Sequence, residues 1–76
     1  MEIDVKLWFN DFNIKDIETK MAHIPRVGDN IFVPFGWIKY NNGDELGIQS
    51  LRVESVDWKI DENLKQTVEL NVTYGD

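Results

Sequence analysis

The chain has 76 residues, of which 42% are hydrophobic and 12% aromatic, and 14 acidic against 8 basic residues give a net charge of −6. This length suits one domain, residues 1–76, with a modest core, and the apolar content is too high for a disordered chain. The absence of cysteine excludes disulfides, thiolate zinc sites and a cysteine nucleophile.

The charge and hydropathy patterns also limit the partners. The basic residues are scattered along the chain, whereas a surface that follows nucleic-acid phosphates carries clustered Lys and Arg. Segment 1–10 lacks the basic and continuously apolar regions of a signal peptide, and no apolar run approaches the roughly 20 residues of a membrane span. We therefore expect a cytoplasmic protein that binds neither nucleic acid nor a membrane.

The first predicted element is a strand over residues 3–9. Apolar residues at the odd positions alternate with mostly polar residues at the even ones, which is the period of a half-buried strand with Trp8 facing away from the core. The next segment, 10–13, reads "NDFN" and contains turn formers whose side chains hydrogen-bond their own backbone. The strand should end at this turn.

The segment 14–24, "IKDIETKMAHI", fits two structures. Period two places Ile17, Thr19 and Met21 on one face of a strand, whereas helical spacing groups Ile14 with Ile17 and Met21 on a short, poorly capped helix. We favour a strand that forms a hairpin with the first one. Its alternate charged residues would then face solvent and discourage edge-to-edge association.

A turn is predicted at Pro25 to Asp29. Pro25 fixes φ and cannot donate to a sheet, and Gly28 can adopt a positive φ, so the chain can reverse before a strand resumes over 30–35. We expect Asp29 to accept backbone N–H bonds in the turn and Val27 to plug the barrel end. Ile31, Val33 and Phe35 are expected to share one face of this strand, with Phe32 on the other.

The second half of the chain predicts two hairpins. Asn42-Gly43 is typical of a type I′ turn, in which both central residues need a positive φ. In the strand over 48–60 the apolar residues change from odd to even positions near residues 54–55, which indicates a β-bulge or a strong bend. A turn over 61–65 and a cleanly alternating strand follow, and Gly75 and Asp76 are expected to end that strand.

These elements predict an all-β fold, a small, partly open antiparallel barrel of about five strands. The turn at 25–29 with its following strand, and the pair "LRVESVDWKI" and "TVELNVTY", resemble SH3-like and KOW-like barrels. "IPRVGD" after a hydrophobic strand is also similar to small uncharacterised proteins of bacteria and phages. The resemblance implies an SH3-like fold and no particular ligand, because the "ALYDY"-like segment of signalling SH3 domains and the basic loops of RNA-binding KOW domains are missing.

No residue pattern predicts catalysis, a metal or a cofactor. His23 is the single histidine and no nucleophile motif accompanies it, so we expect a structural or surface role. The acidic residues within 44–45 and 57–62 lack the spacing of a calcium-binding loop. A chain this short can scarcely form a substrate cleft. We therefore expect that the protein is not an enzyme.

The aromatic residues give the functional prediction, because exposed Trp and Tyr often anchor protein interfaces. We predict a protein-interaction module with acidic loop residues that favour a basic partner. The alternatives are that the aromatics close the two ends of the core, or that the chain is a structural subunit that self-associates through a strand edge or an aromatic patch. The predicted partner-binding residues are Trp37, Ile38, Tyr40, Trp8, Asp44 and Glu45.

Overall fold

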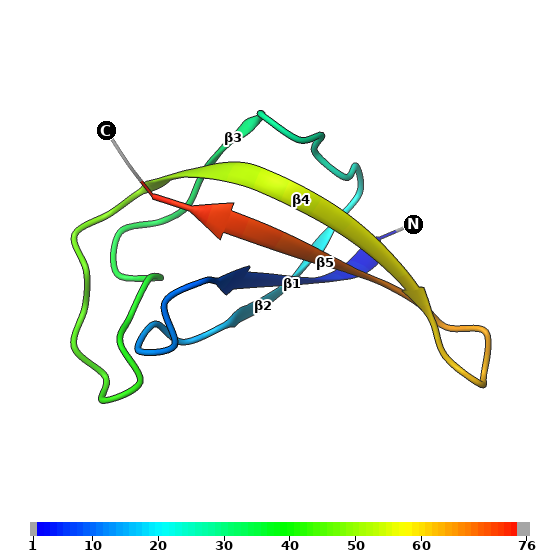
Figure 1. Ribbon diagram of the computed structural model, residues 1–76, viewed down its shortest axis with the longest axis horizontal. Coiled ribbons are helices and arrows are strands. Elements are labelled where there is room, and N and C mark those ends of the chain that lie inside the picture. The colour runs from blue at the N-terminus through cyan, green and yellow to red at the C-terminus, as the bar shows by residue number, and fades with distance from the viewer. Residues whose placement is uncertain (1, 75–76) are drawn as a thin grey trace.

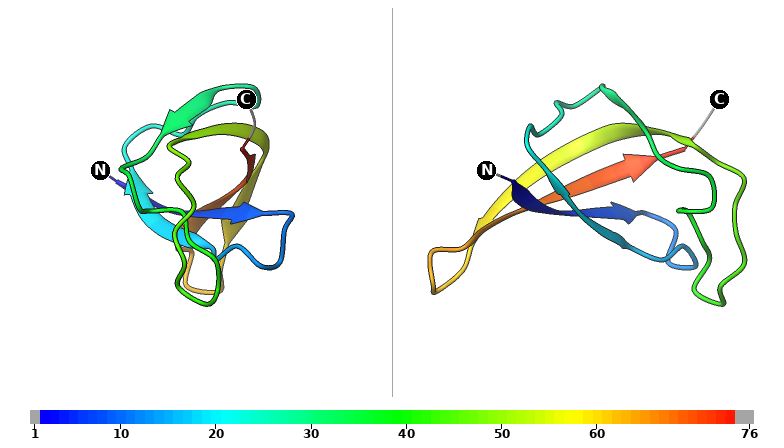
Figure 2. Two further views of the ribbon diagram at one scale, coloured as in Figure 1. Left: turned by 90° about the vertical axis from the view of Figure 1, so that its left-hand side faces the viewer. Right: turned by 180° about the vertical axis from the view of Figure 1, so that it is seen from behind.

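The computed structural model describes residues 2–74, in which five strands form one sheet in the order β2-β1-β5-β4-β3. The sheet curls into a half-barrel (Figure 1; Figure 2, left). The described residues contain no helix, so the predicted all-β, partly open barrel is confirmed, and its shape is consistent with a small SH3-like barrel. The strands are β1 (Ile3–Phe9), β2 (Ile17–Met21), β3 (Asn30–Phe32), β4 (Ser50–Ile60) and β5 (Gln66–Thr73).

One strand pairing differs from the expected antiparallel sheet. β1 pairs with β2, β3 with β4 and β4 with β5 in antiparallel fashion, but β1 and β5 run parallel. The cause is the order of the strands. β2 and β3 are consecutive in the chain but lie at opposite edges of the sheet. β5, the last strand, lies between β4 and β1, where it runs antiparallel to β4 and parallel to β1. The predicted strand end at Gly75 and Asp76 lies outside the described residues.

The core lies on the concave face because β1 and β5 both alternate with period two. Val5 and Leu7 of β1 stand opposite Val68 and Leu70 of β5, and all four side chains are buried. Side chains from the long loop between β3 and β4 complete this cluster. Its buried members are Val5, Leu7, Phe9, Ile14, Val33, Ile38, Leu46, Leu51, Val53, Val68, Leu70 and Val72.

The ambiguous segment after the first turn is a strand, as favoured above. β2 pairs antiparallel with β1, with Ile17 beside Leu7 and Met21 beside Ile3. The helical alternative is wrong, because residues 17–21 are extended and pair with β1. Ile17 and Met21 pack against the core, whereas Glu18 faces solvent. Beyond the strand end, His23 is exposed.

The predicted turn at 25–29 is confirmed in its backbone and wrong in one side chain. Gly28 has a φ of +92°, and the N–H of Asp29 donates to the carbonyl of Arg26 at 3.0 Å. The carboxylate of Asp29 accepts the N–H of Arg26 at 2.9 Å. Val27 sits at the tip of this turn and is exposed, so it does not plug the barrel. The loop between β3 and β4 supplies buried side chains instead.

The strand predicted over 30–35 ends at Phe32. A turn follows in which Gly36 has a φ of +88° and the N–H of Trp37 donates to the carbonyl of Pro34 at 3.2 Å. This turn directs Phe35 to solvent, contrary to the prediction, whereas Val33 remains in the core.

The hairpin tip at Asn42-Gly43 is confirmed, but the predicted turn type is wrong. Only Gly43 has a positive φ, +96°. Its N–H donates to the carbonyl of Tyr40 at 2.9 Å, and the N–H of Tyr40 donates to the carbonyl of Asp44 at 2.8 Å. These bonds define a three-residue loop that ends in the left-handed conformation rather than a two-residue type I′ turn.

β4 is the long bent strand that the sequence predicted. It pairs with β3 through residues 50–52 and with β5 through most of its length, and its register shifts between Val53 and Ser55. Its end projects with β5 as a hairpin away from the rest of the molecule (Figure 1). Trp58 and Ile60 pair with Val68 and Gln66 and so share the concave side, yet they remain 55% and 64% exposed. The core stops short of this hairpin.

Candidate functional site

Two turns that are distant in the sequence are fastened together at one end of the barrel. In the turn after β1, the carboxylate of Asp11 accepts the N–H of Asn13 at 2.9 Å. The side-chain amide of Asn41, in the hairpin tip, donates to the carbonyl of Phe12 at 2.7 Å, and its backbone N–H donates to the carbonyl of Asn13 at 2.8 Å. The two bonds from Asn41 join the turns, and a groove lies beside them.

The groove lies on the outer face of the sheet, beside the fastened turns. Trp8 and Phe12 are the two aromatic lining residues that are not buried, and Asn41 also lines the groove. Trp8 reaches this face because period two turns it away from the buried Leu7 and Phe9. It is half-buried, whereas Phe12 is 93% exposed. We call this the Trp8 groove, and its other lining residues are Lys6, Phe9, Asp11, Ile14, Lys15, Asp16, Glu18 and Glu69.

Acidic groups outnumber basic ones around the Trp8 groove. Four carboxylates stand against two lysines among its lining residues. Two of these carboxylates are already paired, since Asp16 lies 3.4 Å from the Lys6 ammonium and Glu69 lies 3.1 Å from that of Lys59. Asp11 and Glu18 then stand against Lys15. The groove therefore presents excess negative charge beside two aromatic rings, a combination that favours cationic groups.

The indole of Trp8 carries a buried donor that lacks an acceptor. Its Nε1 is shielded from solvent and has no hydrogen-bond partner within residues 2–74. The neighbouring amide of Asn71 is itself occupied, donating at 3.3 Å both to the carbonyl of Trp8 and to Oδ1 of Asn10. A buried donor without a partner costs about 1–3 kcal/mol. An acceptor that reached Nε1 would remove this cost.

Some of the predicted partner-binding residues adjoin the Trp8 groove. Tyr40 and Asp44 line a second shallow hollow on the hairpin tip, together with Asn41. Because Asn41 lines both hollows, the two surfaces meet at this residue. Trp8, Tyr40 and Asp44 can therefore contribute to one extended surface.

The other predicted residues are placed differently. Ile38 is 0% exposed and belongs to the core, so its assignment to a contact surface is wrong. The loop after β3 folds back over the barrel and buries it. Trp37 is exposed but lines neither hollow. Glu45 lies against the backbone of Gly36, where an added Cβ would come within 3.3 Å of its Oε1.

Sequence reasoning missed Phe12. The four residues "NDFN" predict a turn, and the turn explains Asn10, Asp11 and Asn13 without giving Phe12 a role. The available signal was an aromatic residue inside an otherwise polar turn. Such a residue has no strand periodicity to bury it, so exposure is the expected outcome.

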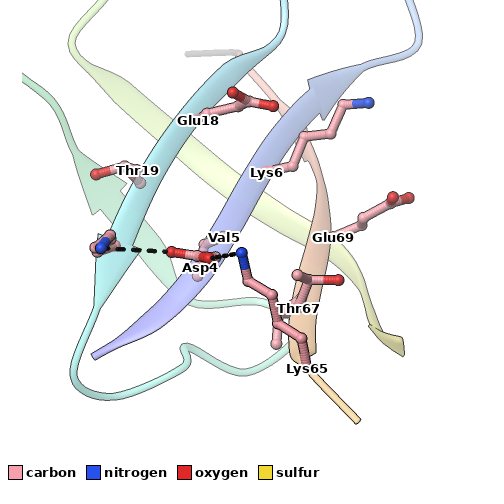
Figure 3. Close-up of a pocket in the computed structure, with 10 residues that line it drawn as sticks. Asp4, Val5, Lys6, Glu18, Thr19, Lys65, Thr67 and Glu69 are labelled. Carbon is pink, nitrogen blue, oxygen red and sulfur yellow. Dashed lines mark ion pairs between the residues drawn. The ribbon is translucent and has the colours of Figure 1, made fainter. Parts of the chain in front are cut away.

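A second feature of the outer face is an array of alternating charges across β2, β1 and β5. Asp4 forms ion pairs with two cations, Lys65 at 2.9 Å and Lys20 at 3.9 Å. Figure 3 shows the ammonium of Lys65 directed at the carboxylate of Asp4. The hydrogen bond from Lys65 and then its charge hold the pKa of Asp4 below its ordinary value of 3.8. Desolvation opposes them with a smaller effect, and the charge of Lys20 adds the smallest contribution. The same contact with Asp4 raises the pKa of Lys65.

These pKa shifts predict how stability depends on pH. The pKa of Asp4 is lowered on folding, so its contribution is present above pH 3.8 and is lost as the pH falls through the lowered value. The raised pKa of Lys65 predicts a contribution that is present below pH 10.5 and is lost at higher pH. Urea unfolding between pH 2 and 7 measures this effect. As the pH falls, the free energy of unfolding should decrease less steeply (a flatter acid limb) for Lys65→Met than for the wild type.

Lys20→Met is the matched control for this pH dependence. Lys20 lies farther from Asp4 than Lys65 does, so its removal should flatten the acid limb less. Equal acid limbs in the wild type and Lys65→Met would contradict the assigned cause.

Comparisons of the chain with protein-family models, with curated proteins and with solved structures found no match. Within residues 2–74 there is no group of three or more His, Asp or Glu side chains that could hold a metal ion. The same residues include no helix with the length and hydropathy of a membrane-spanning segment. The function must therefore be argued from the surface itself.

Proposed function

We propose that this protein is a protein-interaction module that binds a basic segment of a partner protein in the Trp8 groove. The observation that carries the proposal is the exposure of Phe12. Its side chain is 93% exposed on a turn that four hydrogen bonds, within the turn and from Asn41, hold in place. It lines the groove together with Trp8, and neither residue belongs to the core cluster.

The aromatic pair supports binding of a protein rather than of a small molecule. Aromatic side chains bury a large area with few rotatable bonds, which is why they recur among the residues that dominate interface energies. The groove is open rather than enclosed, since most of its lining residues are exposed to solvent. Because those turns are fixed to each other, little conformational entropy is lost when a partner binds.

The charge of the groove supports a basic partner. The excess of carboxylates around Trp8 adds to the net charge of −6 of the whole chain. Such a field speeds encounter with a cationic segment and disfavours acidic ones. A Lys or Arg side chain of the partner would lie over the indole of Trp8, with the carboxylates of Asp11 and Glu18 nearby.

Selection from a random peptide library tests this proposal. Peptides recovered on the wild-type protein should be enriched in Lys and Arg, and their affinity should fall as salt is raised. Trp8→Phe and Phe12→Ala should each weaken the selected peptides about 30-fold, the effect of removing a dominant interface residue. Trp8→Phe keeps a ring on the sheet and removes the unpaired donor, so its fold should be retained.

Trp37→Phe is the matched control, because Trp37 is exposed but lies outside the groove. Binding that Trp37→Phe weakens as much as Trp8→Phe would contradict the proposed site. Selected peptides without an excess of basic residues would contradict the proposed partner.

A further inference from the structure

The outer edge of β4 is only partly covered. β3 pairs with residues 50–52, and Val53 exchanges hydrogen bonds with Gly28 and Asp29 at 2.8 and 2.9 Å. From Glu54 to Ile60 the outer backbone of β4 has no backbone partner in the described part of the chain. An unpaired edge of this length is a template for a further strand.

The hairpin bonds show which residues offer free backbone groups at this edge. The N–H of Asp61 donates to the carbonyl of Lys65 at 3.1 Å, so Asp61 is bonded toward β5. In an antiparallel pair, hydrogen-bonded and non-hydrogen-bonded pairs alternate. The N–H and carbonyl groups of Ile60, Trp58 and Val56 therefore point outward, away from β5.

The same residues carry the apolar side chains of the projecting hairpin. Trp58 and Ile60 face the concave side beyond the end of the core and are 55% and 64% exposed, and Val56 is half-buried. The edge therefore combines free backbone groups with uncovered apolar side chains. No proline interrupts Val56 to Ile60, and the two charged residues of this stretch, Asp57 and Lys59, face the outer side rather than the concave side.

The sequence of this edge is complementary to itself. A two-fold axis at Trp58 places Trp58 opposite its copy, Val56 opposite Ile60 and Asp57 opposite Lys59. The outward backbone groups then meet one another and form about six hydrogen bonds. An axis at Val56 or at Ile60 would instead place Trp58 opposite an acidic residue, Glu54 or Glu62, so the axis at Trp58 is the favoured register.

The charge of Asp57 supports this register. Within its own sheet Asp57 pairs with Glu69, another acid, and it forms no ion pair within residues 2–74. The ammonium of Lys59 lies 3.1 Å from Glu69, on the same outer face. In the two-fold arrangement each Asp57 gains a lysine from the second copy, and opposite charges on directly paired strand residues are stabilising.

We propose that the edge of β4 from Val56 to Ile60 pairs antiparallel with the same edge of a second copy, forming a dimer with one continuous sheet. This surface is distinct from the Trp8 groove, and the proposal does not rest on the proposed function. A five-residue edge is small beside the about 1,200–2,000 Å² of a stable interface, so the dimer should be weak and concentration-dependent.

Sedimentation equilibrium between about 10 μM and 1 mM tests the dimer. The wild type should pass from monomer to dimer in this range. Asp57→Lys places two lysines opposite each other and Lys59→Asp places two acids opposite each other, so each should weaken the dimer about tenfold. The double variant Asp57→Lys/Lys59→Asp restores opposite charges and should dimerise within about threefold of the wild type.

The controls separate this result from general loss of structure and from the Trp8 groove. Circular dichroism should show the wild-type fold for all three charge variants, since both side chains are solvent-exposed. Trp8→Phe should dimerise as the wild type does. A wild type that stays monomeric at 1 mM, a dimer that neither single charge change weakens, or a double variant as weak as the singles would overturn the proposal.

Discussion

Ile38→Ala should lower the free energy of unfolding by about 2–5 kcal/mol, the range for removing the side chain of a fully buried Ile. Ile38 is 0% exposed and belongs to the core cluster, so truncation leaves a cavity beneath the loop after β3. Small domains often have only about 5 kcal/mol of total stability, so this one change can unfold much of the population. Urea unfolding followed by circular dichroism measures the loss.

Trp37→Ala is the control for Ile38→Ala, because the two residues are neighbours in the chain and only Ile38 is buried. We expect Trp37→Ala to cost clearly less. If the two substitutions cost the same, Ile38 is not part of the core, and its predicted place on a contact surface regains support.

Gly28→Ala should lower the free energy of unfolding by about 1–3 kcal/mol, the usual cost of holding a non-glycine residue in a sparsely populated backbone conformation. Gly28 has a φ of +92°, and no atom lies within 4 Å of an added Cβ. The cost is therefore a backbone cost rather than a clash. This cost destabilises the turn at 25–29, whose Gly28 N–H donates to the carbonyl of Val53 at 2.8 Å.

Gly47→Ala tests whether the effect comes from the backbone. Gly47 does not lie in the left-handed region, and an added Cβ there meets only the ring edge of Phe35 at 4.0 Å. We expect the stability of Gly47→Ala to equal or exceed that of the wild type, since alanine reduces the conformational freedom of the unfolded chain. A Gly28→Ala variant as stable as Gly47→Ala would contradict the assigned conformation.

The strands were predictable because their signals are local. Period-two alternation in β1 and β5 already assigns Leu7 and Leu70 to the core and Trp8 to the outer face. The change of phase near residue 54 predicts the irregularity found between Val53 and Ser55. Each of these features depends on a few consecutive residues.

The loops were harder to predict because their burial depends on distant partners. Ile38, in a segment with aromatic and polar neighbours, reads as a surface residue, but the loop folds back so that the N–H of Leu46 bonds to its carbonyl and the core covers its side chain. Phe35 reads as the continuation of a strand, but the turn at Gly36 exposes it. Neither outcome follows from local spacing.

The candidate site was predictable only in part. Trp8 and Tyr40 were expected to be exposed aromatics, but the two hollows that they line share only Asn41, which bonds to a turn 29 residues away in the sequence. The groove and the role of Phe12 therefore required the tertiary structure. The proposed preference for a basic partner needs no tertiary structure, because it is inferred from the acidic composition.

The sequence by itself determined the all-β class, the faces of the long strands, the turn at Gly28 and the acidic charge, because alternation, backbone preference and composition act over short distances. Only the tertiary structure decided that β1 and β5 run parallel, that Ile38 is core, and that two distant turns form the Trp8 groove. Within residues 2–74 it also left the edge of β4 from Glu54 to Ile60 without a backbone partner. Strand order and loop burial depend on contacts between distant segments, whose free energies no local pattern encodes.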